Sequence, residues 1–461
     1  MPHDDIDAAF ERARALDAAG EDATAQRGYL AVLDLDPAHF GALTNLANLL
    51  ERQGHGEIAR AGYREAALNH PDNPAAHVNL GASLLDIDDL EAARAALQTA
   101  LELHPACAEA HQGLAAIFAR LGDDELARYH RDRGFRGRSV VHVPFRGTGR
   151  APRVLLLLAA TGGNVDLRQF LSDRRYDVYK IFADVADRGM DLPPHDLVFN
   201  AIGDADRCGD ALEAAAALAV RTTAPVLNPP RAILATGRVQ NAQRLGALPG
   251  VRAPFTRAFA RTGLGNEPAR ALAAAGFRYP FLVRAPGHHT GAHCYRIEND
   301  LQLTEALSRV PGPEILAIEF LDARSRDGSV RKYRVMAVGG RLYPLHLAIA
   351  ARWMVHYYDA DNAANPAHQA EELRFLEDMP GTLGAKAIEA LQAIARTLAL
   401  DYAGIDFSRD RAGNVLLFEA NATMTIPPRG SGTAGARAAA AVDDLLSRTS
   451  GRAAASPRRD R

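Results

Sequence analysis

The chain has 461 residues, with 53 Lys+Arg against 56 Asp+Glu, and 48% of its positions are hydrophobic. That length allows about two to four folded domains. No stretch approaches the roughly 18 uninterrupted apolar residues of a membrane span, and the acidic N-terminus lacks the pattern of a secretory signal. We therefore expect a cytoplasmic protein that does not bind membranes. Three scattered cysteines exclude a disulfide framework and a four-ligand zinc site.

Charge is distributed unevenly along the chain. Residues 1–135 contain 23 acidic and 11 basic residues, whereas the remainder contains 33 acidic and 42 basic residues. This asymmetry predicts an acidic N-terminal module and a basic C-terminal module that suits an anionic ligand such as a nucleoside triphosphate. Neither half has the dense Lys/Arg stripe of a nucleic-acid-binding protein, so we expect no nucleic-acid partner.

The N-terminal part is repetitive, because Pro37, Pro71 and Pro105 follow one another at intervals of 34 residues. Thirty-four residues is the tetratricopeptide period, in which each unit is a pair of antiparallel helices. Proline ends the second helix because it supplies no amide proton. We expect units at 6–39, 40–73, 74–107 and 108–136, forming an α-solenoid over 1–136. Other positions share the period, namely Ala25, Ala59 and Ala93; Tyr29, Tyr63 and Leu97; and, at the turns, Gly20, Gly54 and Gly122, with Asp88 in place of glycine.

Two segments of this array, LTNLANLLERQG and HVNLGASLLDID, resemble the repeats of the O-linked N-acetylglucosamine transferase type. The resemblance implies that Asn45 and Asn79 line a groove and hold the backbone of a bound peptide or protein. An amide side chain can do so because it both donates and accepts hydrogen bonds. Two alternatives remain: these residues only cap or hydrate their helices, or the array docks one subunit on another in a homo-oligomer.

After a Gly/Arg-rich linker at 137–152, the pattern changes to short apolar runs between polar turns. The runs 154–158, 196–200 and 225–227 predict buried parallel strands, and 210–221 predicts a helix between them. Further on, YPFLVRAPGHHTGAHCYRI (279–297) predicts two strands joined by a Gly/His loop, whose backbone amides can cover phosphates.

The segment YAGIDFSRDRAGNVLLFEANATM (402–424) predicts a hairpin that turns at 410–413. Asp406 lies on its first strand, and Glu419 and Asn421 lie on its second. Residues two apart on a strand project to the same face. Pairing across the turn brings Asp406 near that face as well. Three oxygen ligands of this kind suit Mg²⁺ that also binds triphosphate oxygens and water.

Residues 153–445 resemble ATP-grasp enzymes of the glutathione synthetase and ribosomal-protein glutamate ligase branch. The spacing of Asp406, Glu419 and Asn421, together with the segments NAIGDAD (200–206), LNPPRAILATGR (227–238) and LPGVRAPFT (248–256), carries the resemblance. It implies a multi-subdomain α/β fold, with a first subdomain at 153–235 and the nucleotide-binding and catalytic subdomains at 236–446. We expect the tail at 447–461 to be disordered.

The resemblance also implies roles for single residues. Asp406, Glu419 and Asn421 would hold one or two Mg²⁺ ions, and Arg334 and Arg352 would contact the acyl phosphate or the substrate carboxylate. Arg238 and Arg284 stand where the family usually has lysine; arginine retains the charge and offers a fork for phosphate. The residues expected to bind ATP are Arg238, Arg284, Gly287, His289, Gly291, Glu319, Phe320, Leu321 and Asp322.

The function implied is ATP-dependent carboxylate–amine ligation, in which a substrate carboxylate becomes an acyl phosphate that an amine displaces. The repeats would recruit a peptide or protein, and the substrates would be a small carboxylate and an amine. One alternative is an ATP-binding scaffold with weak turnover whose repeats mediate protein interactions. Another is phosphorylation without ligation, which would produce ADP and no amide.

Overall fold

The computed structural model describes residues 3–287, 291, 293–355, 365–427 and 433–455. The chain divides into two compact units. The first comprises Met1–Ala151 and Asp173–Arg175, and the second comprises Pro152–Ser172 and Tyr176–Arg461. The segment expected to be a linker, 137–152, therefore belongs almost entirely to the first unit. Within the described part of the chain, no helix is both long and apolar enough to cross a membrane.

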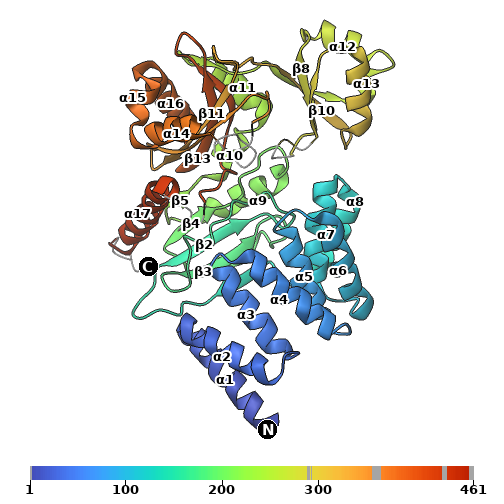
Figure 1. The fold of residues 1–461 in the computed structure, drawn as a ribbon, viewed down its shortest axis with the longest axis vertical. Helices are drawn as coiled ribbons and strands as arrows, with labels where there is room; N and C mark the ends of the chain where they lie inside the picture. Colours follow the sequence, from blue (N-terminus) through green and yellow to red (C-terminus); the bar gives the residue numbers. More distant parts are fainter. Residues whose placement is uncertain (1–2, 288–290, 292, 356–364, 428–432, 456–461) are drawn as a thin grey trace. The chain divides into compact units, whose positions relative to one another are not determined.

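The first unit contains four antiparallel helix pairs, seen in blue to cyan in Figure 1. All four turns inside the pairs have positive φ, including the one formed by Asp88 (63°). Aspartate is one of the few residues other than glycine that adopts this conformation readily, which explains how the repeat tolerates it. The pairs are α1 (His3–Ala19) with α2 (Asp22–Leu35), α3 (Phe40–Arg52) with α4 (Gly56–Asn69), α5 (Pro74–Leu85) with α6 (Leu90–Leu103), and α7 (Ala108–Leu121) with α8 (Asp124–Gly134).

The repeated alanines and aromatic residues form the core of this solenoid. Ala25, Ala59 and Ala93 are buried, as expected for small residues that let paired helices approach closely. Tyr29 and Tyr63 are also buried, and the hydroxyl of Tyr63 donates to Asn48 Oδ1 at 2.6 Å. After α8 the first unit continues through the short strand β1 (Val140–Val143). The segment 173–175 joins it through an ion pair between Arg146 and Asp173.

The second unit begins with a parallel sheet in which the strands run in the order β3-β2-β4-β5. Every residue of β4 is buried, as the continuous apolar run predicts. The expected strands and helix are confirmed as β2 (Arg153–Leu158), β4 (Leu197–Asn200), β5 (Val226–Leu227) and α9 (Gly209–Ala219), and the sheet also contains β3 (Asp177–Phe182). Two helices follow, α10 (Pro230–Leu234) and α11 (Arg238–Gly246).

A second, antiparallel sheet of the order β7-β10-β8-β9 comes next. Leu272 and Leu303, from the two helices beside this sheet, pack with Phe281 and Ile315 in one apolar core. The elements are β7 (Thr256–Ala260), the 3₁₀ turn η1 (Arg261–Leu264), α12 (Pro268–Ala274), β8 (Phe281–Arg284), β9 (Cys294–Ile297), α13 (Asp300–Arg309) and β10 (Glu314–Glu319).

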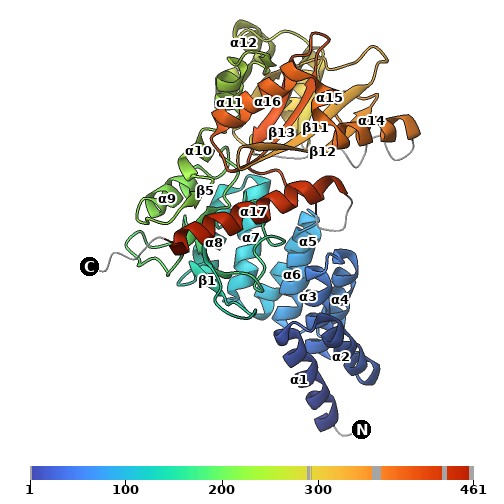
Figure 2. The same ribbon diagram turned by 90° about the vertical axis from the view of Figure 1, so that its left-hand side faces the viewer.

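The third sheet has the order β12-β11-β13-β14-β6 and carries the predicted hairpin. Its register pairs Asp406 with Glu419 and Arg334 with Asp406, so the expected cross-strand placement is confirmed. Helices α14 and α16 pack on this sheet, α14 against β12 and α16 against β14 and β12 (Figure 2). The elements are β6 (Val251–Arg252), β11 (Val330–Val338), β12 (Arg341–Ala350), α14 (Pro366–Glu377), α15 (Met379–Leu383), α16 (Ala385–Leu398), β13 (Tyr402–Arg409) and β14 (Val415–Asn421).

The last helix, α17 (Thr433–Ala455), runs beside β11 and β12. It continues past 447, where we expected disorder to begin. Leu446 is fully buried and Ser450 is 2% exposed, so packing extends this helix into the expected tail. With these boundaries, the predicted fold class, an α-solenoid followed by an α/β region of several subdomains, is confirmed.

Candidate functional site

A cleft in the second unit is lined by residues of the second and third sheets, of α11 and of the loop after β4. Gly287 follows β8, Ile318 belongs to β10, and Glu419 and Asn421 stand at the end of β14. The first turn of α11 adds Arg238 and Asn241, and the loop after β4 adds Asp204 and Asp206. The cleft thus gathers carboxylates, amides and guanidinium groups from segments that are far apart in the sequence.

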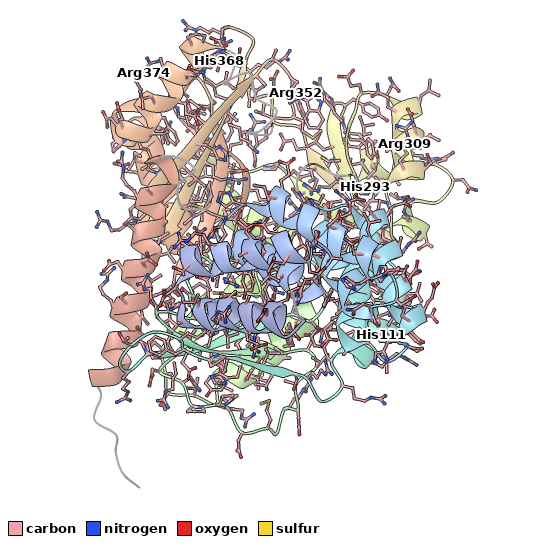
Figure 3. All side chains as sticks on the ribbon, turned by 60° about the horizontal axis from the view of Figure 1, so that its bottom comes forward. His111, His293, Arg309, Arg352, His368 and Arg374 are labelled. Atoms are coloured by element: carbon pink, nitrogen blue, oxygen red, sulfur yellow. The ribbon has the colours of Figure 1, made fainter. Side chains whose placement is uncertain are left out.

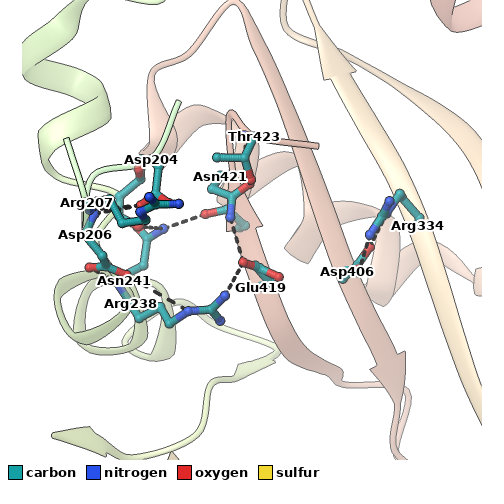
Figure 4. Close-up of polar contacts among 12 residues, drawn as sticks. Asp204, Asp206, Arg207, Arg238, Asn241, Arg334, Asp406, Glu419, Asn421 and Thr423 are labelled. Carbon is teal, nitrogen blue, oxygen red and sulfur yellow. Dashed lines mark hydrogen bonds and ion pairs between the residues drawn. The ribbon is translucent and has the colours of Figure 1, made fainter. Parts of the chain in front are cut away.

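Glu419 is the centre of a polar cluster in this cleft (Figure 4). Arg238 Nη2 donates to Glu419 Oε1 at 2.5 Å, and Asn421 Nδ2 donates to the same oxygen at 2.8 Å. Asn421 Oδ1 in turn accepts hydrogen bonds from the amide and hydroxyl of Thr423. Two of the three predicted metal ligands and one predicted phosphate-binding residue therefore lie together.

Arg284, the second predicted phosphate-binding residue, is buried at the end of β8. Burial lowers the pKa of its guanidinium, and the nearby charge of Arg238 lowers it further. Burial also lowers the pKa of Arg238, but Glu419 and Asp206 outweigh this effect and the net shift is upward. Two buried cations that repel each other form a natural site for an anion.

Asp406, the third predicted metal ligand, is held on the neighbouring strand. Arg334 binds both of its carboxylate oxygens, at 2.6 and 2.8 Å, and Lys332 Nζ lies 3.2 Å from Oδ2. Burial raises the pKa of the Asp406 carboxyl, but these cations outweigh burial and the pKa falls well below its usual range. Figure 4 shows this pair apart from Glu419, Asn421 and Arg238. The structure therefore brings two predicted ligands together and places the third in a separate ion pair.

Asp204, Asp206 and Asn241 also line the cleft, although the sequence predicted no role for them. The backbone amide of Arg238 lies 3.2 Å from Asp206 Oδ1, which places a carboxylate at the N-terminus of α11. Burial raises the pKa of the Asp206 carboxyl, and Arg238 partly offsets the rise. The segment NAIGDAD contained Asp204 and Asp206, but nothing local in the sequence indicates that they meet α11.

The predicted adenine and ribose contacts lie at the end of β10 and beyond. The Glu319 carboxylate accepts hydrogen bonds from Arg252 and from the amide of Phe255. Leu321 is buried in an apolar cluster, and Asp322 forms an ion pair with Arg324. The Phe320 ring lies under the Arg296 guanidinium, 4.4 Å from ring centroid to Cζ. Most of these side chains are engaged within the protein, so their contribution to nucleotide binding stays a prediction.

The remaining predicted residues lie on loops. Gly287 lines the cleft with φ of 67°, and a Cβ there would come 2.0 Å from the Arg207 side chain. Gly291 also has positive φ, and His289 lies outside the described residues. Arg352 follows β12 and is exposed, as Figure 3 shows. Glycine at 287 is thus required both by the backbone conformation and by the space available.

Asn45 and Asn79 occupy equivalent positions on α3 and α5, and both are half-buried. Burial raises the pKa of the Tyr29 hydroxyl to about 12, and a hydrogen bond from the Asn45 side chain partly opposes this rise. The amide of Asn45 is therefore partly used within the solenoid. The peptide-binding role of both residues stays a prediction.

The cleft residues fit Mg²⁺ and a triphosphate in their chemistry. Glu419 and Asn421 offer the oxygen donors that Mg²⁺ prefers when it also binds phosphate and water. Arg238 and Arg284 offer the cations for phosphate oxygens. Among the described residues, no group of three or more His, Cys, Asp and Glu side chains could hold a metal ion.

Comparison with known proteins gives likenesses in fold. No family model matches the chain, and no curated protein matches it. MamA from Desulfovibrio magneticus RS-1 is 24% identical over 29% of this chain and 76% of its own, with a TM-score of 0.26. The VanG D-Ala:D-Ser ligase from Enterococcus faecalis is 13% identical over 65% of this chain and 100% of its own, with a TM-score of 0.42. The D-alanine–D-alanine ligase from Bacillus anthracis complexed with ATP is 15% identical over 66% of this chain and 98% of its own, with a TM-score of 0.41.

Proposed function

We propose that the second unit is an ATP-dependent carboxylate–amine ligase that forms an amide or peptide bond through an acyl phosphate. The observation that carries this proposal is the cleft itself. Arg238, Glu419 and Asn421 are hydrogen-bonded in it, and Arg284 is close enough for its pKa to respond to Arg238. Cations for a triphosphate and oxygen donors for Mg²⁺ thus meet at one place.

The proposed reaction has two steps. A substrate carboxylate attacks the γ-phosphate of ATP, so that an acyl phosphate forms and ADP leaves. An amine then attacks the acyl carbon, inorganic phosphate departs with the bonding electron pair, and the amine loses a proton as the amide forms. Both steps depend on stabilising charge rather than on a covalent bond to the protein. Mg²⁺ held by Glu419 and Asn421, with Asp406 as the third proposed ligand, would neutralise charge on the phosphate oxygens.

Arg238 has to change its partner during this cycle. In the structure it binds Glu419, a proposed metal ligand, at 2.5 Å. If Glu419 held Mg²⁺, the Arg238 guanidinium would be free to bind a phosphate oxygen, whose charge would replace that of the carboxylate. Arg284 lies near Arg238, whose charge lowers its pKa beyond the effect of burial, and a bound phosphate would offset the repulsion between the two cations. Arg334 and Arg352 remain the residues that we propose for the acyl phosphate or the substrate carboxylate.

An ATP-binding scaffold with weak turnover is the second candidate. One observation favours it: Arg334 occupies both oxygens of Asp406, and Lys332 lies beside them, which opposes metal binding by this carboxylate. The two candidates differ in ADP production. A ligase releases ADP and a condensed product, whereas a scaffold binds ATP and releases little of either. Phosphorylation without ligation would release ADP without an amide.

The test is ADP release across a panel of carboxylates and amines, with mass spectrometry for a product lighter by one water than its two parts. Glu419→Gln keeps the shape of the side chain and removes its charge, so we expect Mg²⁺-dependent ATP binding to weaken severely. Glu267→Gln, at an exposed pair with Arg270, is the matched control and should bind as the parent protein does. Unchanged binding in Glu419→Gln would contradict the proposal.

We further propose that the repeats recruit a peptide or protein substrate through Asn45 and Asn79. Their equivalent positions on α3 and α5 support this role, because one repeat separates them. The double variant Asn45→Ala, Asn79→Ala should reduce activity on a long peptide and spare a small substrate. An equal loss on both substrates would refute recruitment.

A further inference from the structure

Beyond these assignments, the end of β14 depends on a residue that no sequence pattern singles out. On its outer edge, β14 pairs with the two-residue strand β6 at Val415 and Leu416. Beyond Leu416, no described strand continues the sheet on that edge. The stretch that carries Glu419 and Asn421 is therefore supported on one edge by β13 and on the other by side chains.

Asn241 supplies this support. Its side chain is 6% exposed, and Nδ2 donates to the carbonyl of Ala420 at 2.6 Å and to the carbonyl of Thr236 at 3.1 Å. Ala420 is the residue between Glu419 and Asn421. Its carbonyl lies in the plane of the sheet, whereas the side chains on either side of it project into the cleft. Fixing this carbonyl restrains the backbone rotation of both neighbours.

The side-chain amide of Asn241 uses its nitrogen and not its oxygen for hydrogen bonds to the described residues. With Nδ2 committed to two carbonyls, Oδ1 is buried and has no hydrogen-bond partner among the described residues. An unpaired buried amide oxygen is unfavourable for folding. The side-chain hydrogen bonds of Asn241 are therefore the two that Nδ2 donates, to Ala420 and to Thr236.

Asn241 also belongs to the same helical face as Arg238, one turn earlier on α11. Arg238 binds the Glu419 carboxylate, and Asn241 binds the backbone one residue further on. We propose that Asn241 is a positioning residue that sets the Glu419 and Asn421 side chains for Mg²⁺ by replacing the missing neighbour strand. This inference rests on the proposed function, because it takes Glu419 and Asn421 to be metal ligands.

The experiment measures how a fluorescent ATP analogue binds as Mg²⁺ is titrated. In Asn241→Ala the half-saturating Mg²⁺ concentration should rise about 10-fold or more, the effect typical of lost support behind a metal ligand. At saturating Mg²⁺ the affinity for the analogue should return to near the parent value, because the phosphate-binding arginines are intact. Asn241→Leu fills the space left in the alanine variant and should show the same rise, since it too lacks the donor.

Asn200→Ala is the matched control. Asn200 is 1% exposed, and its Nδ2 donates to the carbonyls of Asn228 at 3.0 Å and Ile202 at 3.4 Å, neither of which belongs to β14. It should lose thermal stability and keep the parent Mg²⁺ dependence. An unchanged Mg²⁺ dependence in both Asn241 variants, or an equal rise in Asn200→Ala, would overturn the positioning role while leaving the proposed function intact. If the parent protein does not bind the analogue with Mg²⁺ at all, the proposed function fails and this inference fails with it.

Discussion

Two carboxylates on neighbouring strands of the third sheet, Asp406 and Glu419, each form an ion pair with an arginine. The two pairs differ in how deeply they are buried and in how many oxygens the arginine contacts. Asp406 and Glu419 are cross-strand partners, so their backbones are equivalent in position. The Asp406 carboxylate is 5% exposed and bound at both oxygens by Arg334. The Glu419 carboxylate is 24% exposed, and the contact from Arg238 uses one of its oxygens.

The origin of each arginine explains the difference. Arg334 lies on β11 in register with Asp406, so the sheet itself fixes that pair. Arg238 comes from α11, so its pair with Glu419 depends on a side-chain hydrogen bond and is not set by the register of the sheet. The first pair is therefore part of the framework, whereas the second can open when a stronger ligand for either partner arrives. Three substitutions should separate these two roles.

The largest effect should come from Arg334→Met. Removing one partner of a buried pair leaves an uncompensated charge, which typically costs about 3 to 5 kcal/mol. Because Lys332 remains beside Asp406, we expect a loss of about 3 kcal/mol in the free energy of unfolding. Urea denaturation followed by circular dichroism measures it. The double variant Arg334→Met, Asp406→Leu should recover much of this loss, since no buried charge remains; additive losses would show that the pair is not coupled.

The same variant should change the response to acid. In the parent protein the pKa of Asp406 in the folded state lies below its unfolded value of about 3.9. The pair therefore stabilises the fold at pH above the unfolded pKa, and this contribution is lost as the pH falls through the folded pKa. Without Arg334 the folded pKa rises toward the unfolded value, so the pH window between the two narrows, and the acid-induced loss of stability that Asp406 contributes should be smaller than in the parent protein when urea denaturation is repeated at decreasing pH.

The sequence predicted what local patterns can encode. The 34-residue period located the helix pairs and their turns, including the one at Asp88. Alternation and a turn at 410–413 placed Asp406 opposite Glu419. The contact between Arg238 and Glu419 joins residues that are 181 positions apart in the sequence, one on α11 and the other on β14 of the third sheet. No period or spacing reports such a contact, and for the same reason the role of Asn241 was not foreseen. The ion pairs of Asp406 and Asp322 were missed because their partners are set by register and loop geometry.

The second substitution is Arg238→Ala. Because the ion pair between Arg238 and Glu419 can open, this variant should bind ATP more weakly and bind a metal ion without nucleotide more tightly. A charge-assisted hydrogen bond contributes about 1.5 to 3 kcal/mol, so losing this contact to a phosphate should weaken ATP binding roughly 10-fold to 100-fold. Without nucleotide, Glu419 no longer has a competing cation, so Mn²⁺ should bind more tightly to the variant than to the parent. Calorimetry of ATP binding and electron paramagnetic resonance of Mn²⁺ binding measure the two effects. Weaker binding of both ligands would mean that Arg238 supports the site structurally.

The smallest effect should come from Lys332→Met, which removes the weaker of the two cations that contact the Asp406 carboxylate. Lys332 Nζ lies 3.2 Å from Asp406 Oδ2, and its side chain is 16% exposed. Two hydrogen bonds from Arg334 remain in the variant, so the carboxylate keeps its main partner. We expect a loss of about 1 kcal/mol in urea denaturation and a rise in the folded pKa of Asp406 smaller than in Arg334→Met. If Lys332→Met costs as much as Arg334→Met, the carboxylate is shared equally between the two cations, and register with β11 is not what fixes it.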